Sequence, residues 1–291
     1  MSQRAESGRA ARPPRRAART KQVQTEPHLE ARWSRLHVGD CEPWPEEAAI
    51  AALANKASGL AAWLQAHGDP AALAVGLRRA WLEFHAGHFR KAIELGSKLG
   101  PLGACVANKA AAVDTLYARE TPQVLALLTA AIERGEKAVE ALPHHPNTHY
   151  TLALALGRYS QRISILKALA AGLAGRVRTH LEQALAIESR HAEAHVALGL
   201  YHAEIVSKLG AFAAALTYGV SAEKAQEHFR RALRLAPLEP IVHLEYANGL
   251  LLLDADRYRT QASELYERAA ACEPADAMER ADVERARRGL T

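Results

Sequence analysis

Apolar and small side chains recur at helical spacing along most of this 291-residue chain. A stripe of apolar residues from Ile50 to Leu64 predicts helix over residues 45–66, and the Gly-Asp-Pro run at 68–70 ends it. Ala and Leu are abundant, the aromatic residues Phe, Trp and Tyr make up only 5% of the chain, and long β-branched runs are absent. This composition favours helices over strands.

A longer pattern repeats in step in the second half of the chain. Segments that begin at Pro143, Ser189 and Pro237 each carry a histidine six residues later, then a large side chain, then a small one. The residues at these positions are His149, Leu152 and Ala153; His195, Leu198 and Gly199; and His243, Tyr246 and Ala247. Stacked helical repeats typically show such a pattern, because one helix pair cannot bury its apolar face alone.

These blocks resemble tetratricopeptide repeats (TPR). The matching small, aromatic and proline positions are Ala80, Gly87, Phe89 and Ala92 in residues 70–104; Tyr117, Ala131, Ala138 and Pro143 in 105–143; Leu181 and Ala184, besides the residues above, in 144–189; Ala225, Phe229, Ala232 and Pro237 in 190–237; and Ala262, Tyr266, Ala269 and Pro274 in 238–274. The resemblance implies an all-α fold, a right-handed α-solenoid of about five TPR-like helix hairpins. Small residues let the paired helices approach closely, and proline ends the second helix.

Two of these units carry extra residues at the same place. The inserted stretches read ISILKALAAGLAG at 163–175 and KLGAFAAALTYGV at 208–220. A solvated loop would be polar, whereas both stretches are apolar and punctuated by glycine. We expect the inserts to lengthen the helices and pack on each other, or to line a cavity.

The positive charge of the chain is concentrated at its start. Residues 1–21 hold seven basic side chains and one acidic side chain, a net +6, whereas the whole chain carries +5, so the remainder is near neutral at −1. We therefore expect no specific nucleic-acid surface. Residues 1–43 are predicted to be a disordered basic tail and linker, because most of this segment lacks large apolar side chains, and residues 44–291 a single TPR-like helical repeat domain.

The resemblance also implies a binding surface. In tetratricopeptide arrays the first helix of each repeat lines the concave face, and the residues placed there are Leu77, Trp81, Phe84, Tyr150, Leu154, Val196, Leu200, Leu244, Asn248 and Leu251. Such an apolar groove suits an amphipathic helix or a lipophilic ligand. The alternative is that the inserts or the amino-terminal helix of the chain itself cover this face.

Histidine is frequent, yet the sequence predicts no metal site. His191 and His195 share one helical face, and His145 and His149 repeat that spacing, but no cysteine lies near them in sequence. A zinc site needs three or four converging ligands. The motifs of nucleotide-dependent, zinc-dependent and serine-dependent enzymes are also absent. We therefore predict no catalytic residue, no metal ligand and no cofactor, and we do not expect an enzyme.

The favoured function is a non-catalytic interaction scaffold or adaptor that binds an unknown protein partner through the apolar concave groove. The alternative is a protein that handles a hydrophobic ligand, because residues 140–290 loosely resemble the T component of TRAP transporters, which acts with a solute-binding partner. A weaker likeness to regulator-of-microtubule-dynamics repeats covers the same stretch.

The cysteines and the apolar runs bear on location. Cys41, Cys105 and Cys272 are scattered, which is typical of free thiols in a reducing compartment. The start of the chain shows no apolar leader, and no apolar run is long enough to span a bilayer. We therefore expect a cytoplasmic protein without a transmembrane segment.

Overall fold

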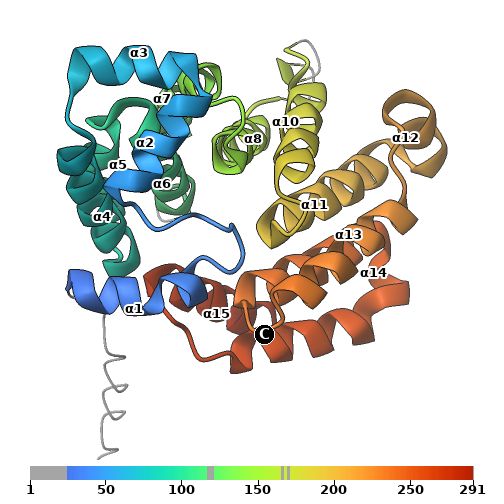
Figure 1. Ribbon diagram of the computed structural model, residues 1–291. Helices are drawn as coiled ribbons and strands as arrows, with labels where there is room; N and C mark the ends of the chain where they lie inside the picture. The colour runs from blue at the N-terminus through green and yellow to red at the C-terminus, as the bar shows by residue number, and fades with distance from the viewer. Residues whose placement is uncertain (1–24, 117–120, 165–166, 169–170, 291) are drawn as a thin grey trace, which may run out of the picture.

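The computed structural model describes residues 25–116, 121–164, 167–168 and 171–290, and these residues form helices and no strands (Figure 1). The helices are α1 Glu26–Leu36, α2 Glu47–Lys56, α3 Ser58–His67, α4 Pro70–Ala86, α5 Phe89–Ser97, α6 Gly100–Asp114, α7 Thr121–Ala141, α8 Pro146–Ser160, α10 Leu173–Ile187, α11 Ala192–Leu209, α12 Ala211–Tyr218, α13 Ala222–Leu235, α14 Pro240–Ala271 and α15 Ala277–Gly289. Within this part of the chain, no helix is both long and apolar enough to cross a membrane.

The helices pair into stacked hairpins. In the described residues these hairpins are α4 with α5, α6 with α7, α8 with α10, α11 with α13, and the two halves of α14. Helix α14 is kinked at Asp254, whose backbone is extended at φ −167° and ψ 99°. The two halves are tied together where the Tyr266 hydroxyl donates to Asn248 Oδ1 at 2.6 Å. The predicted fold class, an α-solenoid of five TPR-like hairpins, is confirmed.

The small residues of the repeat pattern lie where the paired helices touch. Those on the second helix of each hairpin, namely Ala92, Ala138, Ala184, Ala232 and Ala269, are all fully buried. A larger side chain at any of them would separate the two helices. Tyr117, a weak match in the second unit, lies outside the described residues.

The ring of Phe229 on α13 requires glycine at two positions that pack against it. Its ring stacks on Tyr246 with centroids 4.9 Å apart. A Cβ atom at Gly199 would lie 2.6 Å from this ring, and one at Gly249 would lie 2.4 Å from it. Only glycine therefore allows α11 and α14 to approach the ring from both sides.

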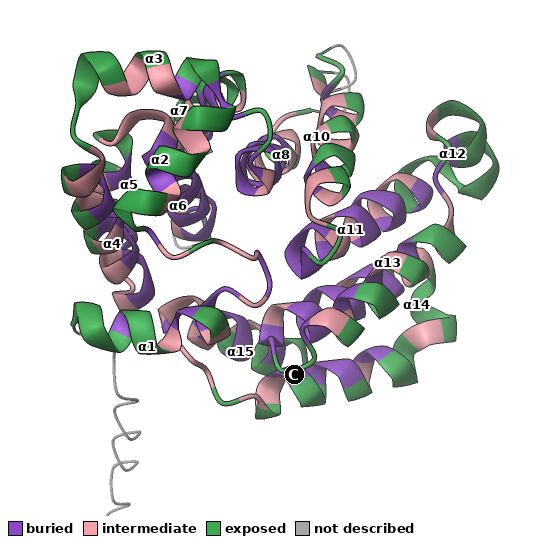
Figure 2. Ribbon diagram, viewed as in Figure 1, coloured by how far each residue is buried: buried purple, intermediate pink, exposed green. Residues whose placement is uncertain are grey.

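The two inserts behave differently. The second insert lengthens α11 to Leu209 and then forms the short helix α12, on which Phe212 and Leu216 are 84% and 79% exposed. Figure 2 shows α12 as a largely exposed helix at the edge of the array. The described part of the first insert connects α8 to α10 and supplies the first residues of α10, while residues 165–166 and 169–170 lie outside the described residues.

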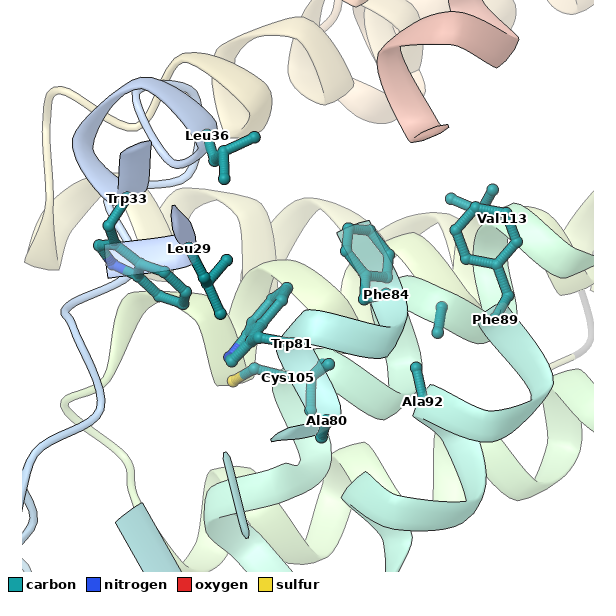
Figure 3. Packing of buried hydrophobic residues seen from close by; sticks show 12 residues of the cluster. Leu29, Trp33, Leu36, Ala80, Trp81, Phe84, Phe89, Ala92, Cys105 and Val113 are labelled. Atoms are coloured by element: carbon teal, nitrogen blue, oxygen red, sulfur yellow. The ribbon is translucent and has the colours of Figure 1, made fainter. Parts of the chain in front are cut away.

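The amino-terminal boundary differs from the expectation. Residues 1–24 lie outside the described residues, but Glu26–Leu36 forms α1, and its residues Leu29, Trp33 and Leu36 are buried (Figure 3). Trp33 packs edge-on against Trp81 with ring centroids 5.8 Å apart. Residues 26–43, which we expected to belong to a disordered tail and linker, instead form a helix and a following segment that contribute apolar side chains to the core.

The segment after α1 is held inside the array by a buried charge cluster. Lys109 on α6 places its Nζ 2.5 Å from Asp40 Oδ2 and 2.8 Å from Glu193 Oε1. The Tyr150 hydroxyl donates to Glu193 at 2.8 Å, and the Glu193 backbone N–H donates to the carbonyl of Gly39 at 2.9 Å. Burial disfavours the charge on Lys109, but the two carboxylates outweigh burial and raise the pKa of its ammonium.

Helix α1 also joins the two ends of the array. Arg35 forms ion pairs with Glu239, at the start of α14, and with Glu279 on α15. On the neighbouring α4, His85 Nδ1 lies 2.7 Å from Asp276 Oδ2 at the start of α15. The first and last repeats therefore meet across α1 instead of lying at opposite ends of an open solenoid.

We expect Gly249→Ala to lower the free energy of unfolding by about 1–3 kcal/mol, because the added methyl group overpacks against the Phe229 ring. Urea denaturation followed by circular dichroism measures this loss. Gly175→Ala is the matched control, since a Cβ atom there meets nothing within 4 Å, and the helix propensity of alanine favours it. Equal stability of the two variants would contradict the packing argument.

We expect Lys109→Met to lower the free energy of unfolding by about 3–5 kcal/mol, because it leaves two buried carboxylates without their cation. Lys98→Met is the control: Lys98 is exposed and pairs with Glu94 on the surface, so its removal should change stability by less than about 1 kcal/mol. Urea denaturation at pH 7 measures both variants. A loss of similar size in the two variants would show that the buried ion pairs of Lys109 contribute no more to the free energy of unfolding than an exposed ion pair does.

Candidate functional site

The residues predicted to line the concave groove differ in burial from one repeat to the next. In the first repeat Leu77, Trp81 and Phe84 are buried beneath the amino-terminal part of the chain. Leu77 packs in a cluster with Ile50 of α2, and Trp81 and Phe84 pack with Trp33 of α1. The chain's own amino-terminal helices therefore cover this part of the inner face, as the alternative in the sequence analysis allowed.

Further along the array, the predicted residues pass from buried to open. Tyr150, Val196 and Leu244 are buried, and Val196 packs near Val38 of the amino-terminal segment. The remaining members of the predicted set, Leu154, Leu200, Asn248 and Leu251, stay partly exposed. The accessible part of the inner face is thus confined to the third, fourth and fifth repeats.

A cleft of about 610 Å³ occupies this open part of the inner face. Leu154, Leu200 and Asn248 line it together, whereas Leu251 packs into the core cluster around Phe229 and its neighbour Leu252 lines the cleft. Clefts of roughly 300–1,000 Å³ with mainly apolar walls are typical of ligand sites.

Both inserts contribute walls to the cleft. Ile163 and Ala168 come from the first insert, and Leu209 and Tyr218 come from the second. The described residues of the inserts therefore show both expected roles, because they line the cleft and also pack in a shared core cluster that includes Ala174 and Ala214.

Helix α10 supplies lining residues that the sequence analysis missed. Val177 and Leu181 line the cleft beside Leu173, although they belong to the second helix of a hairpin, which the family register does not place on the inner face. The apolar character of the insert that precedes α10 was the available signal, because a solvated connection would be polar.

The polar groups of the cleft are fixed by mutual hydrogen bonds. Glu245 forms an ion pair with Arg285 at 2.8 Å and accepts from Asn248 Nδ2 at 2.7 Å. Burial disfavours the charge on Glu245, but Arg285 and Arg158 outweigh it and lower the pKa of the carboxyl. Arg285 also pairs with Asp282 at 3.0 Å. The cleft therefore combines apolar walls with a preorganised, charged patch.

The recurrent histidines have a structural role at the helix starts. Nε2 of His149, His195 and His243 lies 2.9, 3.3 and 2.7 Å from the carbonyl oxygen six residues earlier. Nδ1 of His195 also lies 2.9 Å from Nδ1 of His228 on α13. Donation from Nε2 leaves Nδ1 as an acceptor, so the neutral ring fits this arrangement and the doubly protonated ring does not. The repeating frame therefore reflects hydrogen bonding between units.

The sequence model of the family described as regulator of microtubule dynamics protein 1-3 matches residues 107–290, more than half of the chain. The chain belongs to this family. All the residues that line the cleft lie within the matched range, whereas α1 to α5 precede it. The cleft therefore lies entirely within the residues that match the regulator of microtubule dynamics family. No curated protein sequence matches the chain.

A solved structure independently supports the repeat fold. TTC0263, a thermophilic TPR protein from Thermus thermophilus, superposes with a TM-score of 0.53 at 18% sequence identity. The alignment covers 74% of this chain and 98% of that chain. At this identity the likeness shows a shared TPR-like fold.

We expect acid to destabilise the protein through His195 and its neighbours. Burial, followed by the charge of His228, lowers the pKa of His195 to about 4. The unfolded chain, whose histidine pKa is about 6.5, binds this proton more tightly than the folded protein does. The stability contributed by neutral His195 is therefore complete above about pH 6.5 and is lost as the pH falls towards about 4.

Urea denaturation between pH 7 and pH 4 measures this effect. His195→Gln should flatten the pH dependence by about 1 kcal/mol, a value reduced for the solvent screening of a half-buried ring. His88→Gln is the control, because His88 is exposed, and it should leave the curve unchanged. A pH profile that is the same for wild type and His195→Gln would contradict the assignment.

Proposed function

We propose that this member of the regulator of microtubule dynamics family is a non-catalytic interaction scaffold that binds an apolar segment of a protein partner in the cleft. The observation that supports this proposal most directly is the 610 Å³ apolar cleft on the inner face of the last three repeats. An amphipathic helix matches such a cleft, because its apolar face would contact Leu154 and Leu200 while its polar face stays in water.

Helix α12 extends the apolar surface beyond the cleft. Leu209, just before this helix, and Tyr218, its last residue, line the cleft, while Phe212 and Leu216 project into solvent. Exposed large apolar side chains beside a cleft commonly mark an interaction surface. A helix longer than the cleft would therefore find a second apolar contact on α12.

The charged side chains of the cleft would favour one orientation of a bound partner helix. Glu245 and Arg285 line the cleft as a fixed ion pair, and Lys208 lines it in an ion pair with Glu204. Arg158 lines it as an additional cation. A partner helix that carries acidic side chains at one end would bind in one orientation, because only that orientation brings opposite charges together.

A lipophilic small molecule is the second candidate occupant. The volume of the cleft lies within the range of small-molecule sites, and this occupant corresponds to the ligand-handling alternative of the sequence analysis. Arg158 and Lys208 would then face an anionic group of the ligand. In either case the cytoplasmic location remains part of the proposal, on the basis of the scattered cysteines.

The proposal is tested by placing charge in the cleft. The double variant Leu154→Asp/Leu200→Asp introduces two carboxylates at partly exposed positions, so we expect a folded array that binds its protein partner at least tenfold more weakly, about 1.4 kcal/mol. Affinity capture with wild type and variant, followed by titration of each captured protein, measures the loss. Because the family's name refers to microtubule dynamics, purified tubulin is the first named protein to titrate.

Val75→Asp is the matched control, because Val75 on α4 is 52% exposed and does not line the cleft. A partner that binds the control and wild type equally, but not the double variant, supports the scaffold. Equal binding by all three folded proteins refutes the cleft as the site. Saturable binding of a fluorescent fatty acid that the double variant loses, without any protein captured at the cleft, would replace the scaffold with the ligand-handling function.

A further inference from the structure

A second cluster of functional side chains lies away from the cleft. Glu42 of the segment between α1 and α2, Cys105 on α6 and His145 before α8 each offer a potential ligand atom, and these atoms lie within 4.8 Å of one another. None of the three lines the apolar cleft. We propose that Glu42, Cys105 and His145 form a buried zinc site whose fourth ligand is a water molecule.

The three donors suit zinc chemically. Zinc prefers cysteine sulfur, histidine nitrogen and carboxylate oxygen at about 2.0–2.3 Å, usually in tetrahedral geometry. Those bond lengths place neighbouring ligand atoms about 3.3–3.8 Å apart, so the cluster must contract by about 1 Å around the ion. Glu42 lies in a segment outside the helices, and its flexible side chain can supply most of this movement.

The space between these side chains fits an ion and a water. A small cavity of about 30 Å³ is lined by all three of them together with apolar residues. One water needs roughly 10–15 Å³ by this measure. The remainder of the wall, which includes Trp44 and Leu142, supplies no further side chain of the kinds that bind zinc.

His145 gives a second and independent sign of a missing ligand. Its side chain is buried, and its Nδ1 atom has no hydrogen-bond partner. A buried, unpartnered ring nitrogen costs free energy unless an ion or a water satisfies it. His145 also lies on the wall of the small cavity, so its unpartnered Nδ1 is a candidate donor to the proposed ion.

The surroundings support the carboxylate and the charge balance. Asn147 Nδ2 donates to Glu42 Oε2 at 2.6 Å, a contact that would orient the carboxylate as outer-shell partners of metal ligands do. The nearby Lys109 ammonium is already matched by Asp40 and Glu193. A zinc ion with one thiolate and one carboxylate would therefore be neutral overall, which suits a buried site.

This inference departs from the sequence expectation of no metal ligand. That expectation weighed histidines four residues apart, whereas the cluster joins residues up to 103 positions apart in the sequence, from Glu42 to His145. Zinc bound there would tie the amino-terminal segment to the second and third repeats. The inference is independent of the occupant of the cleft.

Cobalt and zinc alone, added to the purified full-length protein after chelation, test the site. We expect one equivalent of Co²⁺ to produce a thiolate-to-cobalt charge-transfer absorption band, which zinc then abolishes. The band should persist in Cys41→Ser/Cys272→Ser, where Cys105 is the remaining cysteine, and disappear in Cys105→Ser. Zinc should also raise the thermal unfolding midpoint of wild type.

Glu42→Gln and His145→Asn should each weaken zinc binding at least tenfold, while His88→Asn at an exposed histidine should not. Absence of the charge-transfer band in the folded wild-type protein would overturn the proposal, and this readout does not depend on whether any variant folds. Zinc binding that survives in Cys105→Ser, Glu42→Gln and His145→Asn alike would equally overturn it, because the ion would then occupy surface histidines.

Discussion

The buried ammonium of Lys109 is the interaction on which the rest of the structure depends. It compensates Asp40 from the amino-terminal segment and Glu193 from the fourth repeat at once. A cation in the interior is tolerated only when its partners are positioned for it, so this contact fixes the segment after α1 within the concave face. The solenoid thereby fills part of its inner surface with its own chain.

The cleft lies where the amino-terminal segment leaves the inner surface uncovered. The amino-terminal segment covers the first repeat, and its Val38 packs near Val196, but none of its described residues lines the cleft. There the two apolar inserts extend the walls outwards and leave space between α8, α10 and α11. The contacts of the amino-terminal segment and the open cleft therefore occupy different parts of one inner surface.

The sequence predicts the repeats well because their rules are local. Small residues such as Ala184 and Ala232 recur at helix contacts, and the histidine frame marks the start of each unit. The repeat pattern could not predict that Trp33 covers Trp81, because Trp33 lies outside the repeats and the contact joins two segments with no sequence period in common. The repeat register also placed Leu154, Leu200 and Asn248 on one face, and these three residues line one cleft. The lining by Val177 and the grouping of Glu42 with His145 depend on contacts that only the folded chain shows.

The contact of α1 with α14 and α15 has a consequence for how the protein comes apart. Open repeat arrays lose their terminal units one at a time, because each unit touches only its neighbours. Here Arg35 and His85 connect residues roughly 190 to 240 positions apart in the chain. Neither end of the array can therefore unfold without breaking contacts with the other end. We expect the repeats to unfold together in one cooperative transition, and we expect the array to resist stretching until these contacts break.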